Sequence, residues 1–157
     1  MPSWKKLQLL NGSAAAVPKH IKGLSSAKTQ LKAYAALRES LTKAGTWSEA
    51  AVPAAAEILT VASGGSAPAW WLLADLAASD ALAYLANEPQ RDGHGHEVRA
   101  QLAAAEAQVV AATSASAASD RAGALHLLGY LPGQGADAIT ARLDDEDEQV
   151  AATAWLA

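Results

Sequence analysis

Ala14-Ala15-Ala16-Val17-Pro18 recurs as Ala50-Ala51-Val52-Pro53, and each copy opens an amphipathic segment that leads into a second one. The two copies lie about 35 residues apart, which is a period typical of stacked helical hairpins. A single hairpin of this kind cannot bury its apolar stripe, so such hairpins stack along an axis and leave a long curved surface for other macromolecules. The recurrence therefore predicts an all-α protein, a right-handed α-solenoid of about four helical hairpins.

The composition fits one helical domain spanning residues 1–157. Of the 157 residues, 51% are hydrophobic, which is enough for a continuous core. Alanine is the commonest residue and phenylalanine is absent, so we expect close helix packing through small side chains. The absence of cysteine excludes disulfides and thiolate metal sites. Met1–Lys6 contains no apolar signal-peptide core and the sequence has no run of 18 apolar residues, so we expect a cytoplasmic protein without a membrane span.

Charge is distributed unevenly along the chain. Residues 1–60 hold eight Lys and Arg against three Glu, a net charge of +5, whereas residues 61–157 hold four Arg against thirteen carboxylates, a net charge of −9. This asymmetry steers partners without deciding the fold. Nucleic acid is disfavoured, because phosphate binding needs many Lys and Arg contacts. We therefore expect a protein partner, and the alternative is that these charges are only the solvated faces of helices.

The first hairpin is predicted from apolar spacing and turn residues. A short leading helix is expected over Trp4–Leu10, followed by a helix that Ser13 caps. After a Ser-Ser turn, a longer helix is expected to run to Gly45, which supplies the left-handed residue of many helix ends. The side chains expected to face inward on this longer helix are Leu31, Tyr34, Leu37 and Leu41.

The second hairpin is expected to open on Thr46-Trp47-Ser48-Glu49. This stretch has the pattern of a capping box, in which the threonine oxygen and the glutamate satisfy backbone amides. Pro53 is placed about two turns into the helix, so we expect a kink there. After a glycine turn, Pro68 starts the next helix, which is either continuous or interrupted near Ser79-Asp80 and ends before Pro89.

Two further helical pairs complete the pattern. The third pair is expected over about 96–113 and 119–130, and the fourth lies on either side of the acidic turn Asp144–Glu148. The sequence ends on Ala154-Trp155-Leu156-Ala157, whereas terminal repeats normally present a polar outer face. We therefore expect either a truncated array of repeats or an end that packs on something else.

Three features of the sequence resemble HEAT repeats. They are the Val-Pro helix openings, the turn Ala-Gly-Thr-Trp-Ser-Glu-Ala-Ala over 44–51, and Leu-Asp-Asp-Glu-Asp-Glu-Gln-Val-Ala-Ala over 143–152. The resemblance spans nearly the whole chain, which is similar to an uncharacterised group of bacterial HEAT-like proteins. It implies protein binding on a concave surface, which we expect the second helix of each pair to line. HEAT repeats often carry a basic residue where this chain has Ala151, so we expect a weakened Asp-to-Arg ladder between repeats.

Two charged segments, together with Trp71 and Asp75, are candidates for contact with a partner. The first is a basic stripe and the second is an acidic turn. Their residues are Lys28, Lys32 and Lys43 in the stripe and Asp144, Asp145, Glu146 and Asp147 in the turn. By analogy with other HEAT-like scaffolds, the acidic turn suits an immunity or regulatory protein that neutralises a basic partner surface. The expected function is therefore a non-catalytic protein–protein interaction scaffold, whose oligomeric state the sequence leaves open.

An enzymatic alternative rests on Trp70-Trp71-Leu72-Leu73-Ala74-Asp75. This stretch resembles the Trp-Trp-x-x-x-Asp pattern of HEAT-like alkylpurine DNA glycosylases, and Trp71 and Asp75 share a helix face. The resemblance implies that Asp75 stabilises positive charge on the sugar while Trp71 contacts the damaged base. In the competing interpretation a tryptophan of the pair fills the core and Asp75 is a solvated helix residue.

No metal or cofactor is expected. His94 and His96 lie close to two carboxylates, but no regular scaffold fixes them, so a polar loop fits better than a zinc or nickel site. His20 and His126 are expected to be packed or surface side chains on helices. The sequence contains no Gly-x-Ser-x-Gly, phosphate-binding or zinc-protease motif, and its glycine pairs are expected in turns between helices.

Overall fold

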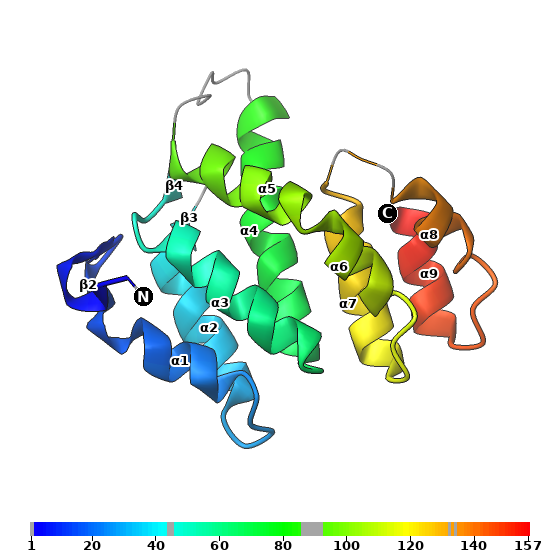
Figure 1. Ribbon diagram of the computed structural model, residues 1–157, viewed down its shortest axis with the longest axis horizontal. Helices are drawn as coiled ribbons and strands as arrows, with labels where there is room; N and C mark the ends of the chain where they lie inside the picture. Colours follow the sequence, from blue (N-terminus) through cyan, green and yellow to red (C-terminus); the bar gives the residue numbers. More distant parts are fainter. Residues whose placement is uncertain (1, 44–45, 86–92, 132, 134) are drawn as a thin grey trace.

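Helices dominate the part of the chain that the structure describes (Figure 1). The structure is a computed structural model, and it describes residues 2–43, 46–85, 93–131, 133 and 135–157. Its helices are α1 (Val17–Gly23), α2 (Gln30–Leu41), α3 (Ala51–Ser63), α4 (Ala67–Leu85), α5 (His94–Ala104), α6 (Glu106–Ala112), α7 (Ala118–Leu128), α8 (Ala136–Thr140) and α9 (Glu148–Leu156). The prediction of a mainly helical protein is confirmed.

The longer helices pack in two rows (Figure 1). In the first row, α1 packs against α3, and α3 packs against α5 and α6. In the second row, α2 packs against α4, α4 against α7, and α7 against α9. Consecutive helices also contact each other across the rows, as α1 does α2 and α3 does α4. The helices from α1 to α7 therefore bury one side against their row neighbours and another side against the opposite row.

The core between the rows is built from alanine and branched aliphatic side chains. Leu37, Ile58 and Leu73 are fully buried. Small residues bring the helices close together, since a Cβ added at Gly123 of α7 would lie 2.6 Å from the Cβ of Trp70 on α4. Trp70 is itself only 1% exposed, so its large side chain is packed into the core next to this glycine.

The N-terminal segment differs from the predicted short helix over Trp4–Leu10. Only Trp4–Lys6 forms a 3-10 turn, after which β1 (Gln8–Leu9) pairs antiparallel with β2 (Gly12–Ser13). Gly12, at φ 99°, adopts a conformation that L side chains rarely take. A helix of seven residues is marginal, and a two-residue turn followed by this glycine favours a hairpin instead. Ser13 does act as a cap, because its Oγ accepts a hydrogen bond from the Ala15 amide in the 3-10 turn that precedes α1.

The prediction that Leu31 of α2 faces inward is wrong. Leu31 is 74% exposed, whereas Ala33, Leu37 and Leu41 are buried and Tyr34 is half-buried. The buried positions follow the helical spacing 33, 37 and 41, which leaves position 31 on the outer side. After α2, β3 (Thr42–Lys43) pairs with β4 (Thr46–Trp47), while the predicted stop at Gly45 lies outside the described residues.

The predicted capping box at Thr46–Glu49 is also wrong, because Thr46 and Trp47 belong to β4. α3 begins at Ala51 without a side-chain cap, and Glu49 Oε2 instead accepts a hydrogen bond from the Gln8 amide at 3.2 Å. Pro53 therefore lies in the first turn of α3, where the missing amide is not needed, and α3 runs unbroken to Ser63. The possible interruption of the next helix is absent too, since α4 is continuous over Ala67–Leu85.

The first helix of the third predicted pair starts before the expected residue 96 and is divided into two helices. It begins at His94 and breaks at Ala105, where φ and ψ are −97° and 11°, giving α5 and α6. Gly95 was expected in a turn but lies inside α5, where a Cβ would come within 2.7 Å of the Trp47 ring. Trp47 is buried and donates its indole N–H to the Leu76 carbonyl, so Gly95 makes room for a fixed ring. Among the described helices, none combines the length and apolar character needed to cross a membrane.

Candidate binding surface

The second row carries polar and aromatic side chains that form two groups of contacts, one at each end of the Trp71–Asp75 face of α4. The helices α2 and α4 each contribute a pair four residues apart, a spacing that places both members on the same side of a helix, and His126 of α7 is followed by Tyr130 at the same spacing. We call these side chains together the second-row surface. Its members are Tyr34 and Arg38 on α2, Trp71 and Asp75 on α4, and His126 on α7 with Tyr130 just beyond it.

Asp75 connects α2 to α4 at one end of this surface. The Tyr34 hydroxyl donates a hydrogen bond to Asp75 Oδ2, and Arg38 Nε lies 3.2 Å from the same oxygen. Burial raises the pKa of Tyr34 to about 12, and the hydrogen bond to Asp75 and its negative charge act in the same direction. The phenol therefore keeps its proton at neutral pH and serves as a fixed donor.

Aromatic rings connect α4 to α7 at the other end. The ring of Trp71 lies 4.6 Å from that of His126, and His126 meets Tyr130 edge-on at 5.3 Å. Burial lowers the pKa of His126, although the charge of Asp75 acts in the opposite direction, so the imidazole is neutral at pH 7. These three rings line a pocket of about 390 Å³ whose other wall includes Thr153 and Leu156 of α9.

The two adjacent tryptophans of α4 have different environments. Trp70 is buried in the core, whereas Trp71 is partly exposed on the second-row surface. Successive helical residues point about 100° apart, which explains the difference. Trp70 is therefore a core residue, and Trp71 is a partly exposed surface residue. Asp75 is also not a simply solvated residue, because Tyr34 and Arg38 both engage its carboxylate.

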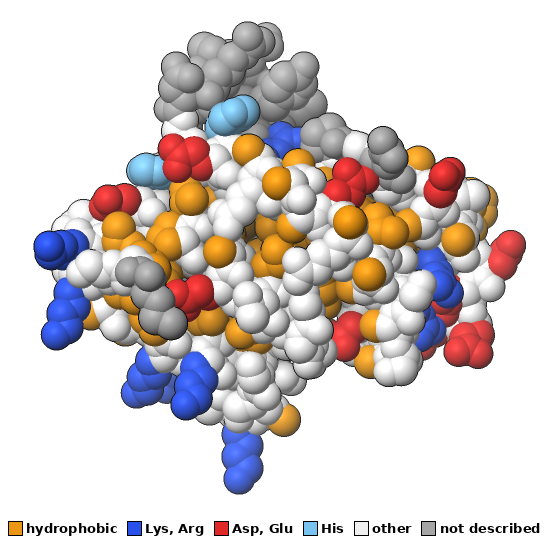
Figure 2. Space-filling model, viewed as in Figure 1, with side chains coloured by type: hydrophobic (Ala, Val, Ile, Leu, Met, Phe, Trp, Pro, Cys, Tyr) orange, Lys and Arg blue, Asp and Glu red, His pale blue; other side chains and the backbone are white. Residues whose placement is uncertain are grey.

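The predicted basic stripe does not form one surface. Lys28, Lys32 and Lys43 are all exposed, but Lys28 precedes α2 and Lys43 follows it in β3. Twelve helical residues span about 18 Å, so the two ends of the stripe are well separated. Lys28 lies in the turn between α1 and α2, and Lys32 lies in the first turn of α2. Figure 2 shows Lys and Arg side chains around α1.

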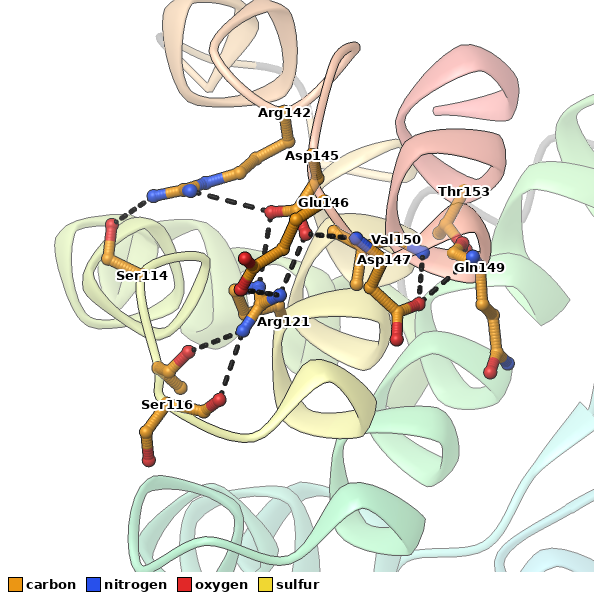
Figure 3. A network of polar contacts seen from close by, with 11 residues as sticks. Ser114, Ser116, Arg121, Arg142, Asp145, Glu146, Asp147, Gln149, Val150 and Thr153 are labelled. Atoms are coloured by element: carbon orange, nitrogen blue, oxygen red, sulfur yellow. Dashed lines mark hydrogen bonds and ion pairs between the residues drawn. The ribbon is translucent and has the colours of Figure 1, made fainter.

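The acidic turn contains both structural and exposed carboxylates (Figure 3). Arg121 Nη2 and Nε donate to the two oxygens of Asp145 at 2.7 and 3.2 Å, and the two side chains are only 9% and 3% exposed. The hydrogen bond from Arg121 holds the pKa of the Asp145 carboxyl below its usual range. Asp147 caps α9 by accepting hydrogen bonds from two backbone amides. Of the four carboxylates predicted to contact a partner, Asp144 and Glu146 are the exposed ones.

The Arg121–Asp145 pair connects the third and fourth helical pairs. Arg121 comes from α7 and Asp145 from the turn before α9, so the pair joins α7 to the segment that leads into α9. Arg121 Nη1 also donates to the carbonyls of Ala115 and Ser116. The weakening of an Asp-to-Arg ladder that Ala151 suggested stays a prediction.

The paired histidines lie in a helix and not in a loop. His94 and His96 occupy the first turn of α5, while the neighbouring Asp92 lies outside the described residues. Among the described residues, no three His, Cys, Asp or Glu side chains are grouped so that they could hold a metal ion.

Sequence reasoning found one of the three pairs in the second-row surface, Trp71 with Asp75. It placed Tyr34 inward and His126 on a helix, and it did not single out Arg38 or Tyr130. The signal that was available is the repeated four-residue spacing of polar and aromatic residues within alanine-rich helices. That spacing does not reveal which helices lie side by side.

Comparisons with known proteins return no relative: no family model, no curated protein and no solved structure matches this chain. A function for the chain therefore has to be inferred from its own residues and their geometry.

Proposed function

We propose that the protein is a non-catalytic protein-binding scaffold of the α-solenoid type and that the second-row surface is its contact with a protein partner. The packing of α2, α4, α7 and α9 in one row supports this, because solenoids bind partners along the extended surface of stacked repeats. The observation that carries the proposal is that two groups of contacts share one face of α4. Tyr34 and Arg38 meet Asp75 there, and Trp71 meets His126, which contacts Tyr130.

The composition of this surface suits protein recognition. Trp, Tyr and Arg dominate the binding energy of many protein interfaces. Here Trp71 is held against His126 and Arg38 is paired with Asp75. Side chains that are already ordered lose less conformational entropy when a partner binds. The second-row surface therefore offers aromatic and cationic anchors that are partly fixed in advance.

A more specific role as an immunity or regulatory protein is supported by the charge distribution. Asp144 and Glu146 are exposed next to α9, and the net charge of residues 61–157 is −9. Such a field attracts a basic partner and accelerates its association at low salt. Neutralising both residues in Asp144→Asn/Glu146→Gln is expected to slow association and to flatten its salt dependence.

Trp71→Ala tests the location of the contact. The partner is first captured on the tagged wild-type chain and identified by mass spectrometry, and its affinity for purified variants is then measured by calorimetry. Trp71→Ala is expected to weaken binding by about tenfold or more, as truncation of a central anchor does. Trp155→Ala is the matched control, because Trp155 is 73% exposed on α9 outside the pocket that Trp71 lines. Wild-type affinity in both Trp71→Ala and His126→Ala would place the contact elsewhere.

A second candidate function, removal of alkylated bases from DNA, is favoured by one observation. Trp71 and Asp75 lie on the same partly exposed surface, as the glycosylase-like pattern requires. The contacts of Asp75 weaken this candidate, because Arg38 compensates the charge of the carboxylate and the Tyr34 hydroxyl occupies one of its oxygens. A glycosylase would release modified bases from alkylated duplex DNA and would lose this activity in Asp75→Asn. Absence of release at an excess of enzyme over DNA would eliminate the candidate.

A further inference from the structure

A second pocket lies away from the second-row surface, between α3, α6 and α7. Its volume is about 310 Å³. Ser63 at the end of α3 and Gln108 of α6 lie on its polar side, and the alanines at 111, 112 and 115 provide much of its apolar lining. Asp120 of α7 is the charged residue among the described residues that line it. The pocket thus combines small apolar walls with one carboxylate.

The Asp120 carboxylate lacks the partners that a buried charge requires. Asp120 is 8% exposed, and its Oδ1 has no hydrogen-bond partner among the residues that the structure describes. The adjacent cation does not serve it, because Arg121 donates to Asp145 and to two backbone carbonyls. Burial raises the pKa of Asp120, as expected for a carboxyl group removed from water without a counter-ion. Buried polar atoms are nearly always satisfied, so a carboxylate with an unsatisfied oxygen at a pocket points to a ligand site.

We propose that this pocket binds a cationic group on an alkyl stem, an alkylammonium or a guanidinium, with Asp120 as its counter-ion. A positive charge is required because it alone compensates a buried carboxylate both by charge and by hydrogen bonding. The alanine walls match the methylene stem that such a cation carries, as they do for the stems of lysine and arginine. Trp70 also lines the pocket, and indole rings attract cations.

The same chemistry is carried by a free polyamine and by a lysine or arginine side chain of a protein. The pocket is separate from the second-row surface, because Trp70 lines this pocket and Trp71 lines the other. Occupancy of the Asp120 pocket therefore does not depend on the proposed partner contact, and either proposal can fail without the other.

The test is a titration of the isotope-labelled protein followed by NMR. The probes are n-butylammonium and ethylguanidinium, with n-butanol as the neutral control of similar shape. The expected result is a saturable shift of the Gly65 and Asp120 amides and of the Trp70 indole N–H with either cation, and none with butanol. Spermidine and an acetylated Gly-Lys-Gly amide then distinguish the sources. Tighter binding of the polyamine indicates a free amine ligand, and tighter binding of the peptide indicates a partner side chain.

Two variants make the assignment specific to this pocket. Asp120→Asn keeps the shape of the side chain and is expected to weaken cation binding at least about tenfold, because it removes a buried counter-charge. Ala111→Leu fills the pocket from an exposed position on α6 and is expected to abolish the shifts while leaving Asp120 in place. Asp137→Asn, at an exposed position on α8, is the matched control and should bind as the wild type does. The proposal is overturned if no cation gives a saturable shift, if butanol binds equally well, or if Asp120→Asn retains the wild-type affinity.

Discussion

Gly123→Ala is expected to destabilise the protein, because α4 and α7 approach each other at this residue. The added Cβ would lie 2.6 Å from the Cβ of Trp70 and 3.4 Å from its Cγ. Carbon atoms in contact prefer about 3.5–4.0 Å, so the two helices would have to separate by roughly 1 Å. Trp70 is 1% exposed and surrounded by core residues, which leaves it little room to move.

Two opposing effects set the size of the change. Overpacking a well-filled core costs about 1–3 kcal/mol. Replacing glycine by alanine within a helix contributes up to about 1 kcal/mol of stability. We therefore expect the free energy of unfolding to fall by about 1 kcal/mol, with a range of roughly 0–2 kcal/mol. For a chain of this length, 1 kcal/mol lowers the Tm by about 2–4 °C.

Urea unfolding monitored by circular dichroism measures this change. Gly93→Ala is the matched control, because a Cβ at Gly93 meets nothing within 4 Å and its backbone is extended. The control should alter the free energy of unfolding by less than about 0.5 kcal/mol. A gain of about 1 kcal/mol in Gly123→Ala, the value for an unobstructed helix, would refute the close approach of α4 and α7.

Two carboxylates are expected to affect stability in opposite directions. Asp145→Asn should lower the Tm at neutral pH, whereas Asp144→Asn should not, because Asp145 alone receives the fork of hydrogen bonds from Arg121. The lowered pKa of Asp145 means that its contribution is full above the ordinary carboxyl range and is lost as the pH falls through the lowered value, so the variant and the wild type should converge in acid. Asp120→Asn should raise the Tm at neutral pH, because the raised pKa of Asp120 shows that folding disfavours its ionised form. This gain should disappear in acid, where Asp120 is neutral in both the folded and the unfolded chain; thermal unfolding across pH checks both expectations.

The helices were largely predictable because their signals are local. Ser13 caps the turn before α1, Pro68 lies in the first turn of α4, and the acidic turn ends with the Asp147 cap of α9. Predictions failed where a distant residue competes for the same groups. Thr46 pairs with Lys43 in a hairpin, so it lies too far before the start of α3 at Ala51 to cap it, and Glu49 accepts a hydrogen bond from Gln8 instead.

The candidate surface was only partly predictable for the same reason. The spacing of Trp71 and Asp75 placed them together, but their neighbours come from α2 and α7, far away in the sequence. The division of the acidic turn also depends on a distant residue, because Arg121 lies 24 positions before Asp145. Local patterns identify which side chains share a helix face, whereas the order of helices in the second row decides which of them meet.

Helix stabilisation does not account for the burial of Asp120. As the third residue of α7, its negative charge interacts favourably with the helix dipole, an effect of about 0.3–1 kcal/mol that an exposed carboxylate supplies equally well. Leaving a buried polar group unsatisfied costs about 1–3 kcal/mol, and more when the group is charged. The adjacent Arg121 shows that this helix can satisfy a buried charge completely, since its guanidinium donates to Asp145 and to two carbonyls. A ligand cation at Asp120 would offset the cost, whereas the dipole alone does not.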